Sequence, residues 1–134
     1  MPQLRIRDAA TFLGVSDDTV RRLIDAGTLA ATVGDGGRKT IDGYALAMYA
    51  RTQSSTVPDL SGIASSARNR FVGLVTSIKS DPVMSQVELQ CGPFRVVSLM
   101  STEAVADLDL VPGSVAVAVI KSTNVIIETR AANP

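Results

Sequence analysis

Residues 65–75 read SSARNRFVGLV, and within these few positions the chain changes from small polar side chains to an apolar run. The apolar part predicts a buried β-strand that begins directly after Ser66, Arg68 and Asn69. The residue types alone leave two interpretations. The polar half is either a solvated loop before a strand, or a cluster of hydrogen-bond donors held at a rigid edge to bind something.

Upstream of this stretch, residues 1–53 have the periodicity of short helices and predict a mostly α-helical N-terminal domain. Gly14 breaks the first helix, and the Ser16 hydroxyl can cap the second. A glycine-rich turn between two strand-like runs follows, and Asp42 can cap a third helix. The residues of that helix expected to face inward are Ala45, Met48 and Tyr49. This order of elements predicts a winged helix-turn-helix.

Downstream, residues 64–134 have strand periodicity, and residues 54–63 predict a linker between the two domains. Five apolar or alternating runs predict strands, the last of them NVIIET at residues 124–129. A short helix is expected over residues 102–110. Five short strands and one helix within about seventy residues predict a small OB-like β-barrel, so the fold class is two-domain α+β.

The composition excludes several functions. The chain has no His and one Cys, which excludes imidazole acid–base catalysis, imidazole metal ligands and an intrachain disulfide. Cys91 lies in an alternating strand pattern and is expected to be buried. We also find no glycine-rich phosphate loop with its Lys, so we expect that the protein is not an enzyme and coordinates no metal directly.

Charge and hydropathy limit both the partners and the location of the protein. Thirteen Lys and Arg balance thirteen Asp and Glu, so affinity for a polyanion must come from a local patch. No apolar run has the length of a membrane span, and the first residues lack a signal-peptide core. We therefore expect a cytoplasmic protein that does not engage a membrane.

The N-terminal sequence LRIRDAATFLGVSDDTVRRLIDAGTLAAT at residues 4–32, with GRKTI at 37–41, resembles the winged helix-turn-helix of the MerR/excisionase group. The resemblance covers roughly residues 4–51 and implies binding of double-stranded DNA, with the second helix in the major groove. The residues implied to contact DNA, on the second helix and then on the wing, are Thr19, Arg21, Arg22, Arg38 and Lys39.

An alternative interpretation of the second helix rests on charge spacing. Asp18 and Arg22, like Arg21 and Asp25, lie four residues apart and can pair on a solvated helix face. The three Asp residues of this helix also repel phosphates. A protein-contact or dimerisation role therefore stays open beside DNA binding.

The C-terminal sequences SARNRFVGLVTSI and VVSLMSTEAVADLDLVPGSVAVAVIKSTNVII resemble the molbindin (Mop, or TOBE) family, from about residue 63 to 128. The resemblance implies a small β-barrel that binds molybdate or tungstate between subunits, with a SARN stretch facing the Lys-Ser stretch of a neighbour. The implied ligands are Ser66, Ala67 through its amide, Arg68, Asn69, Lys121 and Ser122. A second candidate oxyanion site is implied at Thr102 and Glu103.

These residue types suit a tetrahedral dianion, which offers acceptor oxygens and no donors and so needs hydroxyls, amides and cations around it. One departure concerns the last strand. The family often has Ala between Lys and Ser, whereas Ser122 follows Lys121 directly here, so either Ser122 or Thr123 can supply the hydroxyl. Taken singly, each residue also has a purely structural interpretation, such as an ordinary strand start or a solvated strand end.

The two halves together predict a molybdate- or tungstate-responsive transcriptional regulator that works as a homo-oligomer, a dimer or a hexamer. An alternative is an intracellular molybdate storage or buffering protein whose N-terminal domain is an assembly module. A third hypothesis is a DNA-binding protein whose barrel only oligomerises.

Overall fold

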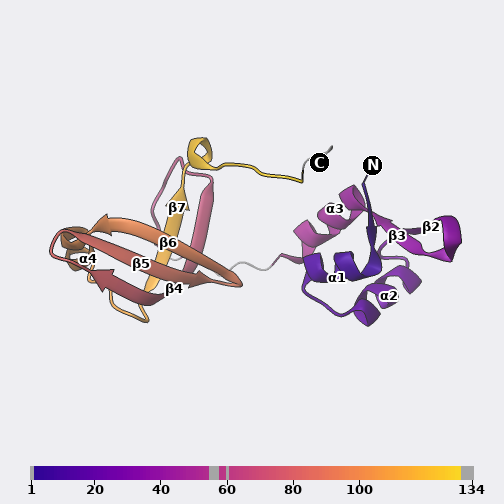
Figure 1. The fold of residues 1–134 in the computed structure, drawn as a ribbon, viewed down its shortest axis with the longest axis horizontal. Helices are drawn as coiled ribbons and strands as arrows, with labels where there is room; N and C mark the ends of the chain where they lie inside the picture. Colours follow the sequence, from indigo (N-terminus) through magenta and orange to yellow (C-terminus); the bar gives the residue numbers. More distant parts are fainter. Residues whose placement is uncertain (1, 55–57, 60, 131–134) are drawn as a thin grey trace. The chain divides into compact units, whose positions relative to one another are not determined.

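The computed structural model describes residues 2–54, 58, 59 and 61–130 (Figure 1). The chain forms two units, residues 1–56 and 57–134, and each unit has a hydrophobic core of its own. The first unit is largely helical, and the second is built on an antiparallel sheet. The change of periodicity in the sequence therefore marks a change of architecture.

The first unit combines three helices with a small sheet. Its helices are α1 (Ile6–Leu13), α2 (Asp17–Asp25) and α3 (Gly43–Gln53). Its antiparallel strands, in the order β1-β3-β2, are β1 (Gln3–Arg5), β2 (Ala31–Val33) and β3 (Lys39–Asp42), and a 3₁₀ turn, η1 (Asp35–Gly37), joins β2 to β3. The buried core residues are Ala9, Ala10, Val20, Leu29, Ile41 and Leu46.

α1 and α2 form a helix-turn-helix because the residues between them end one helix and start the next. Gly14 has a φ of +68°, in the left-handed region that glycine adopts without strain, and its N–H donates to the carbonyls of Ala10 and Thr11. The Ser16 hydroxyl then accepts from the Thr19 amide at 3.2 Å and caps α2. Both predicted signals of the turn are confirmed.

α3 begins as predicted but buries a different residue. The Asp42 Oδ2 atom accepts from the Ala45 amide at 3.0 Å and caps the helix. Leu46 is 3% exposed, whereas Met48, expected inward, is 37% exposed. The sequence could not settle this choice, because apolar residues occupy most positions around this helix. The buried face is decided by the contact with Ile41 and its neighbours in the core.

The second unit is a curled four-stranded antiparallel sheet with one short helix (Figure 1). Its elements are β4 (Asn69–Ser80), β5 (Met84–Cys91), β6 (Phe94–Ser101), α4 (Thr102–Asp107), β7 (Val115–Ile120) and a 3₁₀ turn, η2 (Ser122–Asn124). The strand order is β6-β5-β4-β7. Val75, Val87, Leu89 and Cys91 form the buried core of the unit.

The long strand β4 curls the sheet because it changes partners along its length. Its first half pairs with β7, from Asn69 opposite Ile120 onward, and its second half pairs with β5. A register shift between Val75 and Ser77 bends it. Gly73 has no room for a side chain, since a Cβ atom there would be 2.5 Å from the Gln90 carbonyl oxygen. A side chain at this position would push the strands apart.

The predicted fifth strand does not form within this chain. Residues 125–130 have no regular secondary structure, and Ile126 and Ile127 are each 84% exposed. In the described part of the chain, β6 and β7 are the two edges of the sheet and do not pair with each other, so the barrel is open. The OB-like half-barrel is thus present, with four of the five expected strands, because the terminal run at residues 124–129 pairs with no strand.

A hollow of about 710 Å³ lies on the concave face of this open barrel. Apolar side chains of β5, β6 and β7 line it, among them Leu89, Val96 and Val117, together with Leu108 and Leu110 after α4. A closed barrel of this size would fill such a space with side chains. The second unit by itself therefore leaves a substantial apolar surface exposed to water.

Candidate functional site

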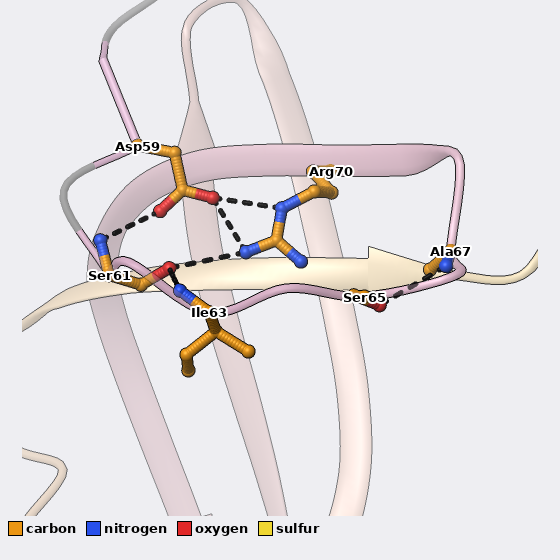
Figure 2. A network of polar contacts seen from close by, with 6 residues as sticks. All are labelled: Asp59, Ser61, Ile63, Ser65, Ala67 and Arg70. Carbon is orange, nitrogen blue, oxygen red and sulfur yellow. Dashed lines mark hydrogen bonds and ion pairs between the residues drawn. The ribbon is translucent and has the colours of Figure 1, made fainter.

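The predicted ligand residues Ser66–Asn69 lead into β4, which begins at Asn69; Figure 2 shows Ala67 of this segment with Ser65. Ala67 is 7% exposed, and its amide donates to the Ser65 hydroxyl at 3.1 Å. Asn69 opens the strand, and its Nδ2 donates to the Ile120 carbonyl at 3.1 Å. Ser66 and Arg68 are exposed to solvent. The segment thus alternates between residues held by the protein and residues available to a ligand.

Lys121 and Ser122 lie at the same end of the sheet in the same chain. Asn69 pairs with Ile120 in the β4–β7 ladder, so Lys121 follows the residue directly opposite Asn69. The turn η2 begins there, and the Asn124 amide donates to the Lys121 carbonyl at 2.9 Å. The side chains of Lys121 and Ser122 are exposed. The fold therefore brings the two predicted halves of the site together, although they are more than fifty residues apart in sequence.

This cluster offers donors of the kinds that a tetrahedral oxyanion requires. Arg68 and Lys121 carry positive charge, and Ser66 and Ser122 add hydroxyls. The Ala67 amide and the Asn69 carboxamide already donate to internal acceptors, so each would exchange that acceptor for a ligand oxygen. Because the cluster of one chain is open to solvent, a second surface is needed to exclude water from a bound anion.

Two residues that sequence reasoning missed support this segment. Ser65 accepts the Ala67 amide, a contact two residues along the chain that is typical of serine in turns. Asp59 pairs with Arg70: the guanidinium Nε and Nη2 donate to Asp59 Oδ2 at 2.8 and 2.6 Å (Figure 2). The Ser61 amide donates to the other carboxylate oxygen at 3.0 Å. The two-residue spacing of Ser65 and Ala67 could have indicated the first contact. No sequence signal indicates the second, because Asp59 and Arg70 are eleven residues apart and Asp59 lies in the expected linker.

The second candidate site, Thr102 and Glu103, lies at the other end of the sheet. β6 ends at Ser101, which pairs with Met84. Met84 lies next to Ser85, the partner of the last residue of β4, so this site is at the end of the twelve-residue strand opposite to Asn69. The Thr102 hydroxyl contacts the Ser85 hydroxyl and donates to the Asp81 carbonyl, both at 2.8 Å. Its amide donates to the Val83 carbonyl. The Thr102 hydroxyl is therefore occupied by the buried Ser85 and the Asp81 carbonyl, and Glu103 is exposed beside it.

The predicted DNA-contact residues lie on α2 and at the start of β3. Arg21, Arg22, Arg38 and Lys39 are all exposed. The Thr19 hydroxyl contacts the Ser16 hydroxyl at 3.0 Å, within the cap of α2. Arg21 forms an ion pair with Asp18 at 3.2 Å, three residues away rather than the four that spacing favoured, and both side chains are more than half exposed. Such an exposed pair is weak and can be replaced by a phosphate contact.

Metal and thiol chemistry find little support in the described residues. Within residues 2–54, 58, 59 and 61–130, no group of three or more His, Cys, Asp or Glu side chains could hold a metal ion. Cys91 is buried, and burial raises the pKa of its thiol, which keeps it protonated. Among the same residues, no helix is both long and apolar enough to span a membrane.

Known proteins match both units. Residues 4–54 match a helix-turn-helix domain, and residues 65–127 match the TOBE domain. The Molybdenum transport protein ModE of Herbaspirillum seropedicae is 36% identical over 85 residues, which are 58% of this chain and 32% of that protein. The chain thus spans about a third of the length of this relative.

Shorter relatives match over nearly their whole length. Molybdenum-pterin-binding protein 3 of Clostridium pasteurianum is 40% identical over 63 residues, which are 46% of this chain and 93% of that protein. The solved structure of a molybdate binding protein from Sporomusa ovata is 30% identical and superposes with a TM-score of 0.48, over 50% of this chain and 100% of that one.

The Asp59 carboxylate gives a testable pH dependence. Hydrogen bonds from the side chain and amide of Ser61, and then from Arg70, lower its pKa from the ordinary 3.8 to about 2. A lowered folded-state pKa stabilises the fold above pH 3.8, and this contribution is lost as the pH falls from 3.8 toward 2. We expect the carboxyl ¹³C signal of Asp59 to titrate near pH 2, and Ser61→Ala to raise the midpoint. A midpoint of 3.8 in the unsubstituted protein would contradict the described contacts.

Proposed function

This chain belongs to the TOBE-domain family of molybdenum-binding proteins, and on that premise we propose that it is a DNA-binding regulator that responds to molybdate or tungstate. The observation that carries the proposal is the meeting of Ser66–Asn69 with Lys121 and Ser122 at one end of the β4–β7 pair. Both segments lie within residues 65–127, the part that matches the TOBE domain. The donor set fits an oxyanion, since it consists of hydroxyls, amides and two cations.

In this proposal each type of residue makes a different kind of contact with the anion. Arg68 and Lys121 supply charge-assisted hydrogen bonds and balance the two negative charges. Ser66 and Ser122 donate through hydroxyls that can rotate toward the ligand, and Ala67 and Asn69 add neutral N–H donors. The molybdenum or tungsten atom stays inside its shell of oxygens, so the chain needs no side chain that binds the metal itself.

We further propose that the site is completed between subunits of a homo-oligomer, as a dimer or a hexamer. The open barrel supports this arrangement, because the apolar hollow faces two strand edges and the terminal segment carries exposed Ile126 and Ile127. The terminal segment of a neighbouring copy would add a fifth strand in the gap between β6 and β7 and fill the hollow. This exchange would bring one subunit's Lys121 region close to the neighbour's barrel and shield the anion from water.

DNA recognition would come from the first unit. α2 presents Arg21 and Arg22, and Thr19 lies in its first turns, where a recognition helix contacts base edges. Arg38 and Lys39 follow the turn between β2 and β3, where a wing contacts phosphates. One such unit binds weakly, so two half-sites and an oligomer are expected.

Storage of the oxyanion is the second candidate function, and one observation favours it. α2 carries Asp17, Asp18 and Asp25, and Arg21 is partly neutralised by Asp18. Such a surface repels phosphates more than a basic helix does. A storage protein would bind the anion in the same site and would show no sequence-specific DNA binding at any salt concentration.

The anion site is tested by calorimetric titration with molybdate, with sulfate as the control of equal charge. Arg68→Ala is expected to weaken molybdate binding at least about tenfold, because one charge-assisted hydrogen bond is removed. The matched control is Arg95→Ala, which removes an exposed arginine on β6. An absence of heat and of thermal stabilisation with either anion in the unsubstituted protein would exclude both the regulator and the storage function.

The strand exchange is tested with Ile126→Asp combined with Ile127→Asp. Burial of two isoleucines is worth about 3–6 kcal/mol, so we expect their loss to raise the dissociation constant of the oligomer at least about a hundredfold. Light scattering at a fixed concentration would report the mass. Val33→Asp replaces an exposed apolar residue of the first unit and should leave the mass unchanged. An unchanged oligomer in the double variant would contradict the exchange.

DNA binding is tested with a duplex selected from a random library. Lys39→Ala is expected to lower the slope of log affinity against log salt by about one, because one phosphate contact of the wing is removed. Arg95→Ala again serves as the control and should keep the slope. Failure of the selection to enrich any sequence would favour storage over regulation.

A further inference from the structure

The Asp59–Arg70 ion pair joins the end of the expected linker to the strand that carries the anion ligands. Arg70 is the second residue of β4, directly after Asn69. Asp59 lies inside residues 54–63, which the sequence predicts to be a linker between the units. The linker is therefore attached to the second unit earlier than its composition indicates.

Both side chains of this pair are largely enclosed, whereas the two other ion pairs of the described residues each have at least one side chain that is more than half exposed. The side chains of Asp59 and Arg70 are 28% and 24% exposed, against 81% and 56% for Asp18 and Arg21. Two guanidinium N–H groups share one carboxylate oxygen, and Arg70 also donates to the Ser61 hydroxyl at 3.3 Å. The Ser61 hydroxyl in turn accepts from the Ile63 amide at 3.4 Å. Networks of this kind hold their geometry better than single exposed pairs do.

The position of the pair limits how far the first unit can lie from the second along the chain. α3 ends at Gln53, six residues before Asp59, and six residues of fully extended chain span at most about 20 Å. Without the ion pair, the first buried residue of the second unit in the described part of the chain is Ala67. The connection would then have fourteen residues and could span about 50 Å.

We propose that Asp59 and Arg70 are positioning residues that set the reach of the helix-turn-helix unit. This inference rests on the proposed function, since reach matters only if two such units of an oligomer bind two half-sites together. A short connection restricts the separation and rotation of half-sites that both units can occupy at once. The pair therefore determines the half-site spacing that the protein accepts.

The same pair couples the reach of the helix-turn-helix unit to the occupancy of the anion site. Arg70 is one residue beyond Asn69, and Ser65 and Ala67 lie in the loop between Asp59 and the strand. An anion held by Ser66–Asn69 stabilises the start of β4, and the stabilised strand start holds Arg70 in place to bind Asp59. A bound anion then favours the state in which the Asp59–Arg70 pair is formed and the connection is short. The anion thus binds one state of the connection more tightly than the other, which is what control by a ligand requires.

The experiment measures binding to duplexes that carry two copies of the selected half-site at varied spacing. Five inserted base pairs turn one half-site to the opposite face and move it by about 17 Å. With molybdate present, the unsubstituted protein is expected to lose at least about tenfold in affinity on this insertion. The Asp59→Asn and Arg70→Gln proteins are each expected to lose less than about threefold in affinity on the same insertion, because their longer connection lets both units reach their half-sites.

The matched control is Glu88→Gln, which breaks the ion pair of Glu88 with Arg95 on β5 and β6 and leaves the connection untouched. It should keep the spacing preference of the unsubstituted protein. Binding to a single half-site, and molybdate titration, show that each variant is folded. Hydrogen exchange of residues 61–66 reports whether this segment stays attached to the second unit, and it is expected to accelerate in Asp59→Asn and in Arg70→Gln but not in Glu88→Gln.

The outcomes separate the two proposals. If the unsubstituted protein binds no duplex, the regulatory function fails, and the role of Asp59 and Arg70 in reach fails with it. If it binds DNA with a clear spacing preference that Asp59→Asn and Arg70→Gln retain, only the positioning role is overturned. Unchanged hydrogen exchange in Asp59→Asn would overturn it as well.

Discussion

The long strand β4 is the element on which the second unit depends. It pairs with β7 along its first half and with β5 along its second, and the close approach at Gly73 makes this change of partner sterically feasible. Its start places Asn69 beside Ile120, and therefore beside the segment that carries Lys121. The two halves of the candidate anion site thus meet because one strand reaches both of its neighbours.

The barrel of the second unit is open and leaves apolar side chains exposed. A chain that leaves an apolar hollow between β6 and β7, and leaves Ile126 and Ile127 in water, has a strong hydrophobic reason to associate. Association and anion binding would then reinforce each other, since a ligand that binds only the assembled form stabilises it by mass action. In such a protein the concentration of the anion and the concentration of the chain act on the same equilibrium.

The first unit is almost neutral. With seven Lys and Arg against six Asp in residues 1–53, it has little net charge to attract DNA nonspecifically. Specific binding by such a domain relies on geometry: a helix cap that orients α2, a hairpin that presents Arg38 and Lys39, and a partner unit at a suitable distance. In our proposal, the Asp59–Arg70 pair limits that distance.

The sequence by itself determined the local structure of this protein, because capping and turn signals act between residues that are close along the chain. Gly14, Ser16 and Asp42 predicted helix ends correctly, and the apolar run after Asn69 predicted β4. The helical and sheet-based halves followed from periodicity in the same way. Only the tertiary structure decided which face of α3 is buried, whether the last apolar run has a partner, and that Asp59 binds Arg70. Each of these depends on which surfaces meet in space, and residues distant in sequence carry no local signal of that meeting.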